Sequence, residues 1–158
     1  MSITFDDLVQ SISNKDFIIL GEIHGTKEIP EVMKNIINEL IKTGLKNIFL
    51  EIPKNQQKYL DSNKDLPFFV DNLAHDGRDS LEYLDLIYWL KSLNLNLICI
   101  DGEETHDRDH TMFLNIKNYI NDGKSVLITG NFHASLKPFN FQNNLMKTTG
   151  SYLKEIFK

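Results

Sequence analysis

The stretch FIILGEIHG, residues 17–25, is the segment that decides the fold. Its first four residues are continuously apolar and lead directly into Gly21, as expected for a strand that is covered on both faces. Glu22 and His24 follow at once, and Gly25 ends the segment. Polar residues just after a buried strand are typical of parallel sheets, which bind ligands beyond the carboxyl ends of their strands.

The same pattern returns three more times along the chain. Further apolar strands are expected at residues 48–50, 97–100 and 126–129. Helices with apolar residues at three- and four-residue steps are expected at residues 5–12, 29–41, 79–93 and about 107–120. Beyond residue 134 the pattern is weak, apart from a short helix at 152–157. This alternation predicts a single α/β domain over residues 1–158, with a mainly parallel sheet of four or more strands flanked by helices on both faces.

Composition limits the classes of function. The chain has 158 residues, of which 41% are hydrophobic and 25% charged, as in a folded protein with one core. A net charge of -5 argues against nucleic-acid binding, which depends on many Lys and Arg contacts. No apolar run approaches the roughly 20 residues of a membrane span, and the N-terminus does not resemble a signal peptide. We therefore expect a cytoplasmic protein, although a protein exported by a non-standard route would have the same sequence features. Cys99, inside an apolar run, is expected to be a buried core residue.

Residues 54–79 differ from the rest of the chain. They are polar and irregular, with Pro67, Gly77 and many Asn, Asp and Lys residues, and they follow Glu51 directly. We expect one or two short helices here that cover the site, and hydrogen exchange faster than in the strands.

All four expected strands end in polar residues: Glu22 with His24, Glu51, Asp101, and Asn131 with His133. The carboxyl ends of parallel strands meet at one edge, so these side chains should lie together. If the backbone is extended, the two-residue spacing points Glu22 and His24 to one side, and likewise Asn131 and His133. An arginine in the first turn of a helix is unfavourable to the helix dipole, which makes Arg108 a further candidate.

These residue types indicate acid–base chemistry. A neutral imidazole suits proton abstraction near pH 7, so His24 is the expected general base. A carboxylate, Glu22 or Glu51, would fix its tautomer, and Arg108 would stabilise an oxyanion. Two nearby glutamates would repel, raising the pKa of one so that it serves as the acid. The expected catalytic residues are Glu22, His24, Glu51, Arg108 and His133; the expected substrate-binding residues are Asp101, Asp109 and Asn131.

The motifs also resemble a known family. GEIHGT (21–26), FLE (49–51), YWLKSLN (88–94), RDHTMFLNI (108–116), GNFHA (130–134) and TGSYL (149–153) resemble, in order, motifs of the erythromycin esterase-like family. The superfamily suggested by this pattern also contains ChaN-like haem-binding proteins and Tiki/TraB-type proteins, some of them metalloproteases. The resemblance implies a minimal-core member in which His24 activates water close to Glu51 and His133.

Three functions follow as hypotheses. The first is a hydrolase of ester or amide bonds in a small-molecule or peptide substrate. The second is a haem- or ligand-binding protein of the ChaN-like type, with His75 or Tyr59 as the axial ligand. The third is a non-catalytic remnant that acts as an interaction module. No G-x-G-x-x-G, P-loop, G-x-S-x-G or C-x-x-C motif supports another chemistry.

The cofactor is left open between none and a divalent metal ion. Two imidazoles and two carboxylates could bind Zn²⁺ or Mn²⁺ with a position left for water; these ligands would come from Glu22, His24, Glu51 and His133. A histidine that binds a metal cannot also be the free base, so a glutamate would then take that role. The chain has no compact ligand motif such as H-E-x-x-H, which favours the metal-free version.

Overall fold

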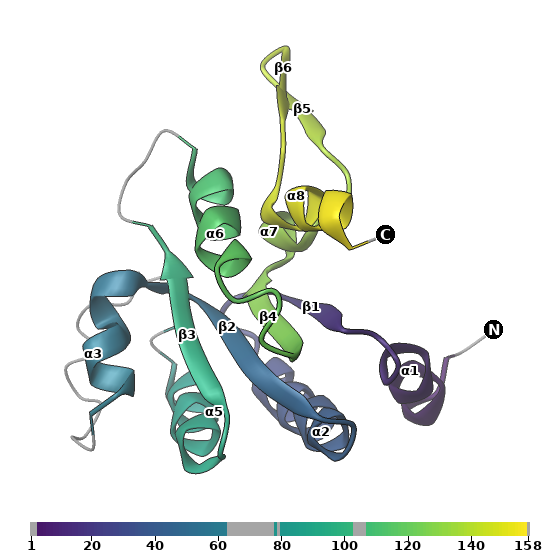
Figure 1. The fold of residues 1–158 in the computed structure, drawn as a ribbon, viewed down its shortest axis with the longest axis vertical. Coiled ribbons are helices and arrows are strands. Elements are labelled where there is room, and N and C mark those ends of the chain that lie inside the picture. The colour runs from purple at the N-terminus through teal and green to yellow at the C-terminus, as the bar shows by residue number, and fades with distance from the viewer. Residues whose placement is uncertain (1–2, 63–77, 79, 103–106, 158) are drawn as a thin grey trace.

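A four-stranded parallel sheet forms the centre of the computed structural model, in the order β1–β4–β2–β3 (Figure 1). The structure describes residues 3–62, 78, 80–102 and 107–157. The strands are β1 (Phe17–Glu22), β2 (Leu45–Pro53), β3 (Asn96–Asp101) and β4 (Lys124–Gly130). Each pairing is parallel, so the strands all end at the same edge of the sheet. The α/β class and the parallel sheet expected from the sequence are confirmed.

Strand β2 is longer than its apolar core, and polar pairing explains the difference. The sequence predicts residues 48–50, whereas the strand begins at Leu45. Asn47 is fully buried, and its Nδ2 donates to Ser125 Oγ of β4 at 3.2 Å. Asn96 Nδ2 of β3 donates to Asn47 Oδ1 at 2.9 Å. A buried amide is tolerated when it is hydrogen-bonded, so this side-chain row extends the sheet beyond the apolar residues.

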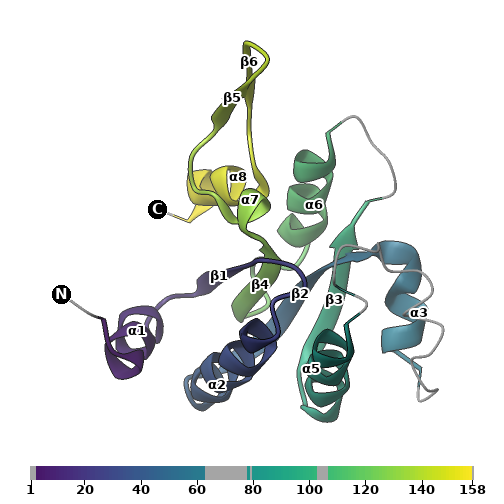
Figure 2. The ribbon, with the colours of Figure 1, turned by 180° about the vertical axis from the view of Figure 1, so that it is seen from behind.

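Helices cover both faces of the sheet, as expected. On one face, α2 (Glu28–Lys42) and α5 (Leu81–Ser92) pack against alternate residues of β2, including Ile48 and Leu50. On the other, α6 (Arg108–Lys117) and α8 (Thr149–Ile156) pack around Phe49. Figure 2 shows α2 and α5 together on one side of the strands. Because both faces are covered, the central strands are continuously buried rather than alternating.

Several helix boundaries differ from the sequence expectation. Helix α5 begins at Leu81, and its cap is Ser80, whose Oγ accepts the backbone N–H of Tyr83 at 3.2 Å. Helix α8 begins at Thr149, three residues earlier than the apolar pattern indicates, because Thr148 and Ser151 form a capping box in which serine replaces the more usual glutamate. Helix α1 (Phe5–Ile12) begins at the expected residue, where Thr4 and Asp7 form a capping box.

Short elements complete the described chain. The 3₁₀ helix η1 (Lys54–Gln56) and α3 (Gln57–Leu60) follow β2. Helix α7 (Asn131–Ala134) follows β4, and a hairpin of β5 (Phe139–Phe141) and β6 (Asn144–Met146) projects from the end of the molecule at which α7 and α8 lie (Figure 1). The proposed cover at 54–79 falls largely outside the described residues. None of the helices in the described ranges is long and apolar enough to cross a membrane.

Candidate active site

An open cavity of about 470 Å³ lies at the carboxyl ends of β1, β4 and β2. All five side chains expected to be catalytic line it. The full lining is Glu22, Ile23, His24, Glu51, Arg108, Gly130, Asn131, Phe132 and His133. The strand ends converge as expected from the sequence, because parallel strands carry their carboxyl ends to one edge.

The first histidine pair is local. Glu22 is the last residue of β1 and is only 4% exposed. Beyond it the chain turns at Gly25, whose φ of 77° is one that glycine adopts without strain. This turn brings His24 Nδ1 to 3.1 Å from Glu22 Oε1. The Glu22 carboxylate raises the pKa of His24, and burial opposes that rise.

The second histidine pair is built from three helices. His133 of α7 donates from Nδ1 to Asp109 Oδ1 of α6 at 2.8 Å. The same oxygen accepts the backbone N–H of Thr149 at 2.7 Å and its hydroxyl at 2.8 Å, both from the start of α8. Burial alone would raise the pKa of Asp109, but the bonds from His133 and Thr149 lower it. Asp109 therefore stays a carboxylate that holds the His133 ring in one tautomer.

Glu51 lies between the two pairs and is 2% exposed. Its Oε2 accepts Thr129 Oγ1 at 2.6 Å and the Gly130 N–H at 2.8 Å, while Oε1 accepts Arg108 Nη2 at 2.7 Å. Burial would raise the pKa of Glu51, but these hydrogen bonds and the charges of His133 and Arg108 lower it. Glu51 is therefore not the glutamate with a raised pKa that repulsion was expected to produce, because cations and donors surround it.

Arg108 connects the carboxylates to the second histidine. Its Nε and Nη2 form a bidentate pair with Asp101, at 2.8 and 2.6 Å. Nη2 also binds Glu51, and Nη1 lies 3.4 Å from His133 Nε2. The Asp101 hydrogen bonds raise the pKa of Arg108, so the guanidinium stays charged. Within the described residues, three of the five N–H groups of Arg108 donate to Asp101 and Glu51, and the other two are on Nη1.

Two buried contributors carry little sequence signal. Arg78 is 5% exposed and donates from Nη1 to the Glu51 carbonyl oxygen at 2.5 Å. It lies in the polar stretch before α5, where no spacing distinguishes it from its neighbours. Thr129 is fully buried and occupies the last position before Gly130. A polar residue at the end of an apolar strand is the signal by which it could have been found.

The residues expected to bind substrate have separate placements. Asn131 lines the cavity and is exposed, but α7 begins there, so Asn131 and His133 are not an extended pair. Asp101 and Asp109 contact Arg108 and His133, respectively. A Cβ at Gly130 would lie 3.1 Å from His24 Nε2, so a side chain here would crowd the first pair.

The cofactor hypotheses receive no geometric support from these residues. In the described ranges, no group of three or more His, Cys, Asp and Glu side chains is placed to hold a metal ion. Tyr59, one of the two suggested haem ligands, packs against the hydrophobic core. The other, His75, falls outside the described residues.

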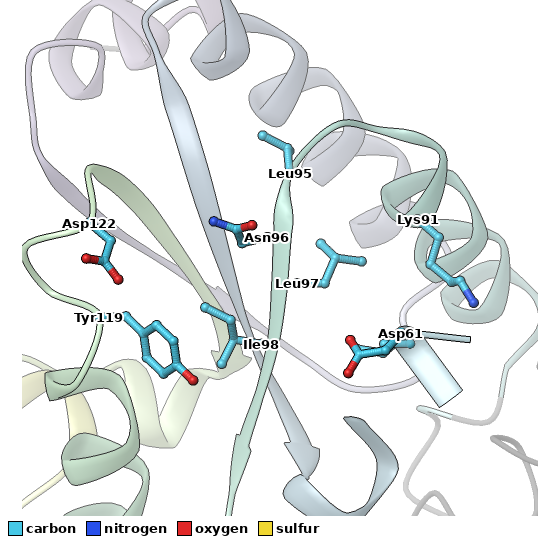
Figure 3. A pocket seen from close by; sticks show the side chains of 9 residues that line it. Asp61, Lys91, Leu95, Asn96, Leu97, Ile98, Tyr119 and Asp122 are labelled. Atoms are coloured by element: carbon cyan, nitrogen blue, oxygen red, sulfur yellow. The ribbon is translucent and has the colours of Figure 1, made fainter. Parts of the chain in front are cut away.

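A second cavity of about 470 Å³ lies along β3, an edge strand of the sheet (Figure 3). Asp61 and Lys91 lie on one side of β3, and Tyr119 and Asp122 on the other. Lys91 Nζ donates to the carbonyl oxygens of Tyr59 and Ser62 at 3.1 and 2.8 Å. The described lining of this second cavity contains no histidine, arginine or glutamate. The strand-end cavity is therefore the better candidate for acid–base chemistry.

Bacterial toxin and effector domains share this architecture. The type III effector HopBA1 is 17% identical with a TM-score of 0.66, over 90% of this chain and 78% of that one. A Bacillus cereus protein is 14% identical with a TM-score of 0.75, over 98% and 67%. The C-terminal region of Pasteurella multocida toxin, described as having a thiol-protease-like catalytic triad, is 13% identical with a TM-score of 0.64, over 98% and 24%. No protein-family model matches the sequence, and neither does any curated protein.

These matches correct the family assignment. The resemblance to the erythromycin esterase-like family and its ChaN-like and Tiki relatives is wrong, since the fold instead matches toxin and effector domains. Several of the short motifs behind this resemblance coincide with strand ends. Glycine turns and polar residues are common there in any parallel sheet that has a ligand-binding site. Nor does Cys99 suit a thiol mechanism. It is 2% exposed, and burial raises its pKa to about 12.

Proposed function

We propose that this chain is a hydrolase that cleaves an ester or amide bond with water, using two histidine–carboxylate pairs. One observation carries the proposal: His24 and His133 line a single cavity, and each has its Nδ1 against a carboxylate. A carboxylate at Nδ1 orients an imidazole so that Nε2 transfers protons. The region of Pasteurella multocida toxin that shares this fold is described as having a thiol-protease-like catalytic triad, so a relative in fold contains a hydrolytic type of site.

The proposed reaction begins with attack of water on the carbonyl carbon. His24 takes the water proton at Nε2, and Glu22 stabilises the imidazolium that forms. The oxyanion accepts a hydrogen bond from Arg108 Nη1. When the tetrahedral intermediate collapses, the bond to the leaving group breaks, and protonated His133 gives its Nε2 proton to the leaving oxygen or nitrogen. Proton exchange with solvent restores both histidines.

Glu51 has an electrostatic role in this proposal. Its lowered pKa keeps it anionic, so it neither donates the proton nor consumes the base. Glu51 Oε1 lies 3.8 Å from His133 Nε2 and 2.7 Å from Arg108 Nη2. Its negative charge is therefore next to the proposed acid, His133, and next to Arg108, which stabilises the oxyanion. Such a preorganised charge stabilises positive charge beside it without reorganising during the reaction.

The cavity rim suggests the kind of substrate. Ile23 and Phe132 line the cavity and are 63% and 53% exposed. Phe132 packs edge-on against Phe139 of the hairpin, with ring centroids 4.5 Å apart. An apolar group beside the scissile carbonyl would bury this surface. Aryl esters and peptides with an apolar residue next to the cleaved bond are therefore the first substrates to test.

The proposal is tested by screening the protein against aryl esters, lactones and peptides, then repeating the active assay with His24→Gln and His133→Gln. Each variant should lose at least about a hundredfold in kcat/KM, the usual contribution of a positioned acid or base. His110→Gln is the matched control, because His110 is exposed on α6. Equal activity in all three variants, or no hydrolysis of any substrate, would refute the proposal. Activity that is lost on chelation and restored by a metal ion would overturn the assignment of His24 as the base.

A further inference from the structure

A third cavity lies away from the candidate active site, beside β1. Its volume is about 420 Å³. The lining residues come from α1, β1, α7 and α8 and from the segments that follow α1, α7 and α8. β1 is an edge strand, because the sheet order begins with it. Figure 1 shows α1, β1 and the end of α8 on the same side of the molecule. The candidate active site does not use this cavity, since none of its lining residues is shared.

Several of the apolar side chains that line this cavity remain accessible. Ile12, Phe17 and Phe157 contribute to the lining, and Leu136 is 51% exposed. The neighbouring helix α1 contains no buried residue, although Phe5, Leu8 and Ile12 recur on one face. A helix of eight residues is marginal in water and depends on burial of its apolar face. Exposed apolar surface of this kind marks a binding site more often than ordinary surface.

Charge identifies the ligand class. Lys15 and Lys154 are the ionisable residues in the cavity's described lining, and both are cations in a protein of net charge -5. Neither forms a salt bridge with a described residue. Apolar walls with a few charged groups are typical of small-molecule sites, whose volumes are roughly 300–1,000 Å³. The complementary ligand has an apolar body and one anionic group.

We propose that this cavity binds a single fatty carboxylate of medium or long chain. The acyl chain lies against Phe17 and Leu136, and the carboxylate lies between Lys15 and Lys154. A concave cavity of this size accepts one chain, whereas a membrane would present a broad anionic surface. The site does not depend on the proposed hydrolase activity, because binding requires no turnover.

Calorimetric titration with decanoate and decylammonium, which have the same chain length and opposite charge, tests the proposal. Decanoate should bind saturably with one site per chain. Decylammonium should bind at least about tenfold more weakly, which corresponds to ~1.4 kcal/mol. Equal affinities, or no saturable binding of decanoate, would overturn the proposal.

Variants identify the site. The double variant Lys15→Glu with Lys154→Glu should weaken decanoate binding at least about tenfold. Lys46→Glu with Lys117→Glu changes the net charge equally at exposed positions elsewhere, and should leave binding unchanged. Leu136 is half-exposed, so Leu136→Asn removes apolar surface from the cavity without changing the buried core. This variant should also weaken decanoate binding. Equally weakened decanoate binding in the control variant would overturn the assignment of the site. Light scattering tests whether the protein is a dimer. A dimer that dissociates in L136N would also overturn the proposal, because a second copy of the chain would then occupy the cavity.

Discussion

The two histidines of the strand-end cavity are held by carboxylates in opposite ways. His24 and Glu22 are two residues apart, at the end of one strand. His133 and Asp109 are 24 residues apart on different helices, and Asp109 is held in turn by Thr149, 40 residues further along the chain than itself. The first pair depends on one backbone turn, whereas the second depends on how α6, α7 and α8 pack. A substitution that disturbs the packing of these helices should therefore disrupt the His133–Asp109 pair and leave the His24–Glu22 pair intact.

Asp109→Asn should have the largest effect. The amide loses the charge that favours one tautomer of His133, and the corresponding change in a Ser-His-Asp triad costs about 10⁴-fold in kcat. We expect a loss of about a thousandfold in kcat/KM with any active ester, measured by steady-state kinetics. Asp107→Asn is the control, because asparagine also caps helices well and Asp107 is the N-cap of the same helix. A D109N protein with near-normal activity would show that the second pair is not catalytic.

Gly150→Ala should break the packing that supports the second pair. In a helix this change normally stabilises, by up to about 1 kcal/mol. Here the new Cβ would lie 2.6 and 2.7 Å from the carbonyl oxygens of Ala134 and Ser135. We expect a loss of about 1–3 kcal/mol in the free energy of unfolding, measured in urea. In NMR spectra, the imidazole chemical shifts of His133 should change and those of His24 should not. Stabilisation would contradict the close contact of α7 and α8.

Glu22→Gln should change the pH dependence of the first pair alone. The Glu22 carboxylate raises the pKa of His24, so its removal lowers that pKa. A general base works in its neutral form, and the neutral fraction rises with pH through the pKa. The acid limb of the kcat/KM profile should therefore move to lower pH in E22Q. A limb that stays in place, or moves to higher pH, would exclude His24 as the titrating base.

Thr149→Val should have the smallest effect. Valine keeps the backbone N–H that donates to Asp109 and loses the hydroxyl, which donates to Asp109 Oδ1 at 2.8 Å and lies 3.3 Å from the Asp109 carbonyl oxygen. One hydrogen bond to a partly buried group contributes about 1 kcal/mol, or roughly fivefold in kcat/KM. Thr149→Ser should restore most of the activity, because serine keeps the hydroxyl. Equal losses in both variants would mean that the methyl group, rather than the hydrogen bond, positions Asp109.

The strand ends were predictable because their signal is local. Each buried strand is an apolar run, and the residues that follow it stand at the carboxyl edge in any parallel sheet. Glu22, His24, Glu51 and His133 were found in this way, and they line one cavity. The hairpin of β5 and β6 was missed, because its turn uses Gln142 and Asn143 at positive φ rather than the Asn-Gly signal of such turns.

By itself, the sequence determined the α/β class, the parallel sheet and the edge at which the polar residues gather. Periodicity and strand ends are properties of neighbouring residues, so they can be read along the chain. Only the tertiary structure decided the charge states and partners within the site. Glu51 stays anionic because Arg108, Thr129 and Gly130 reach it from other elements, and Asp109 faces His133 because three helices pack together. Contacts between residues far apart in the chain leave no periodic trace, and low identity to the matched structures shows the same fold arising from different residues.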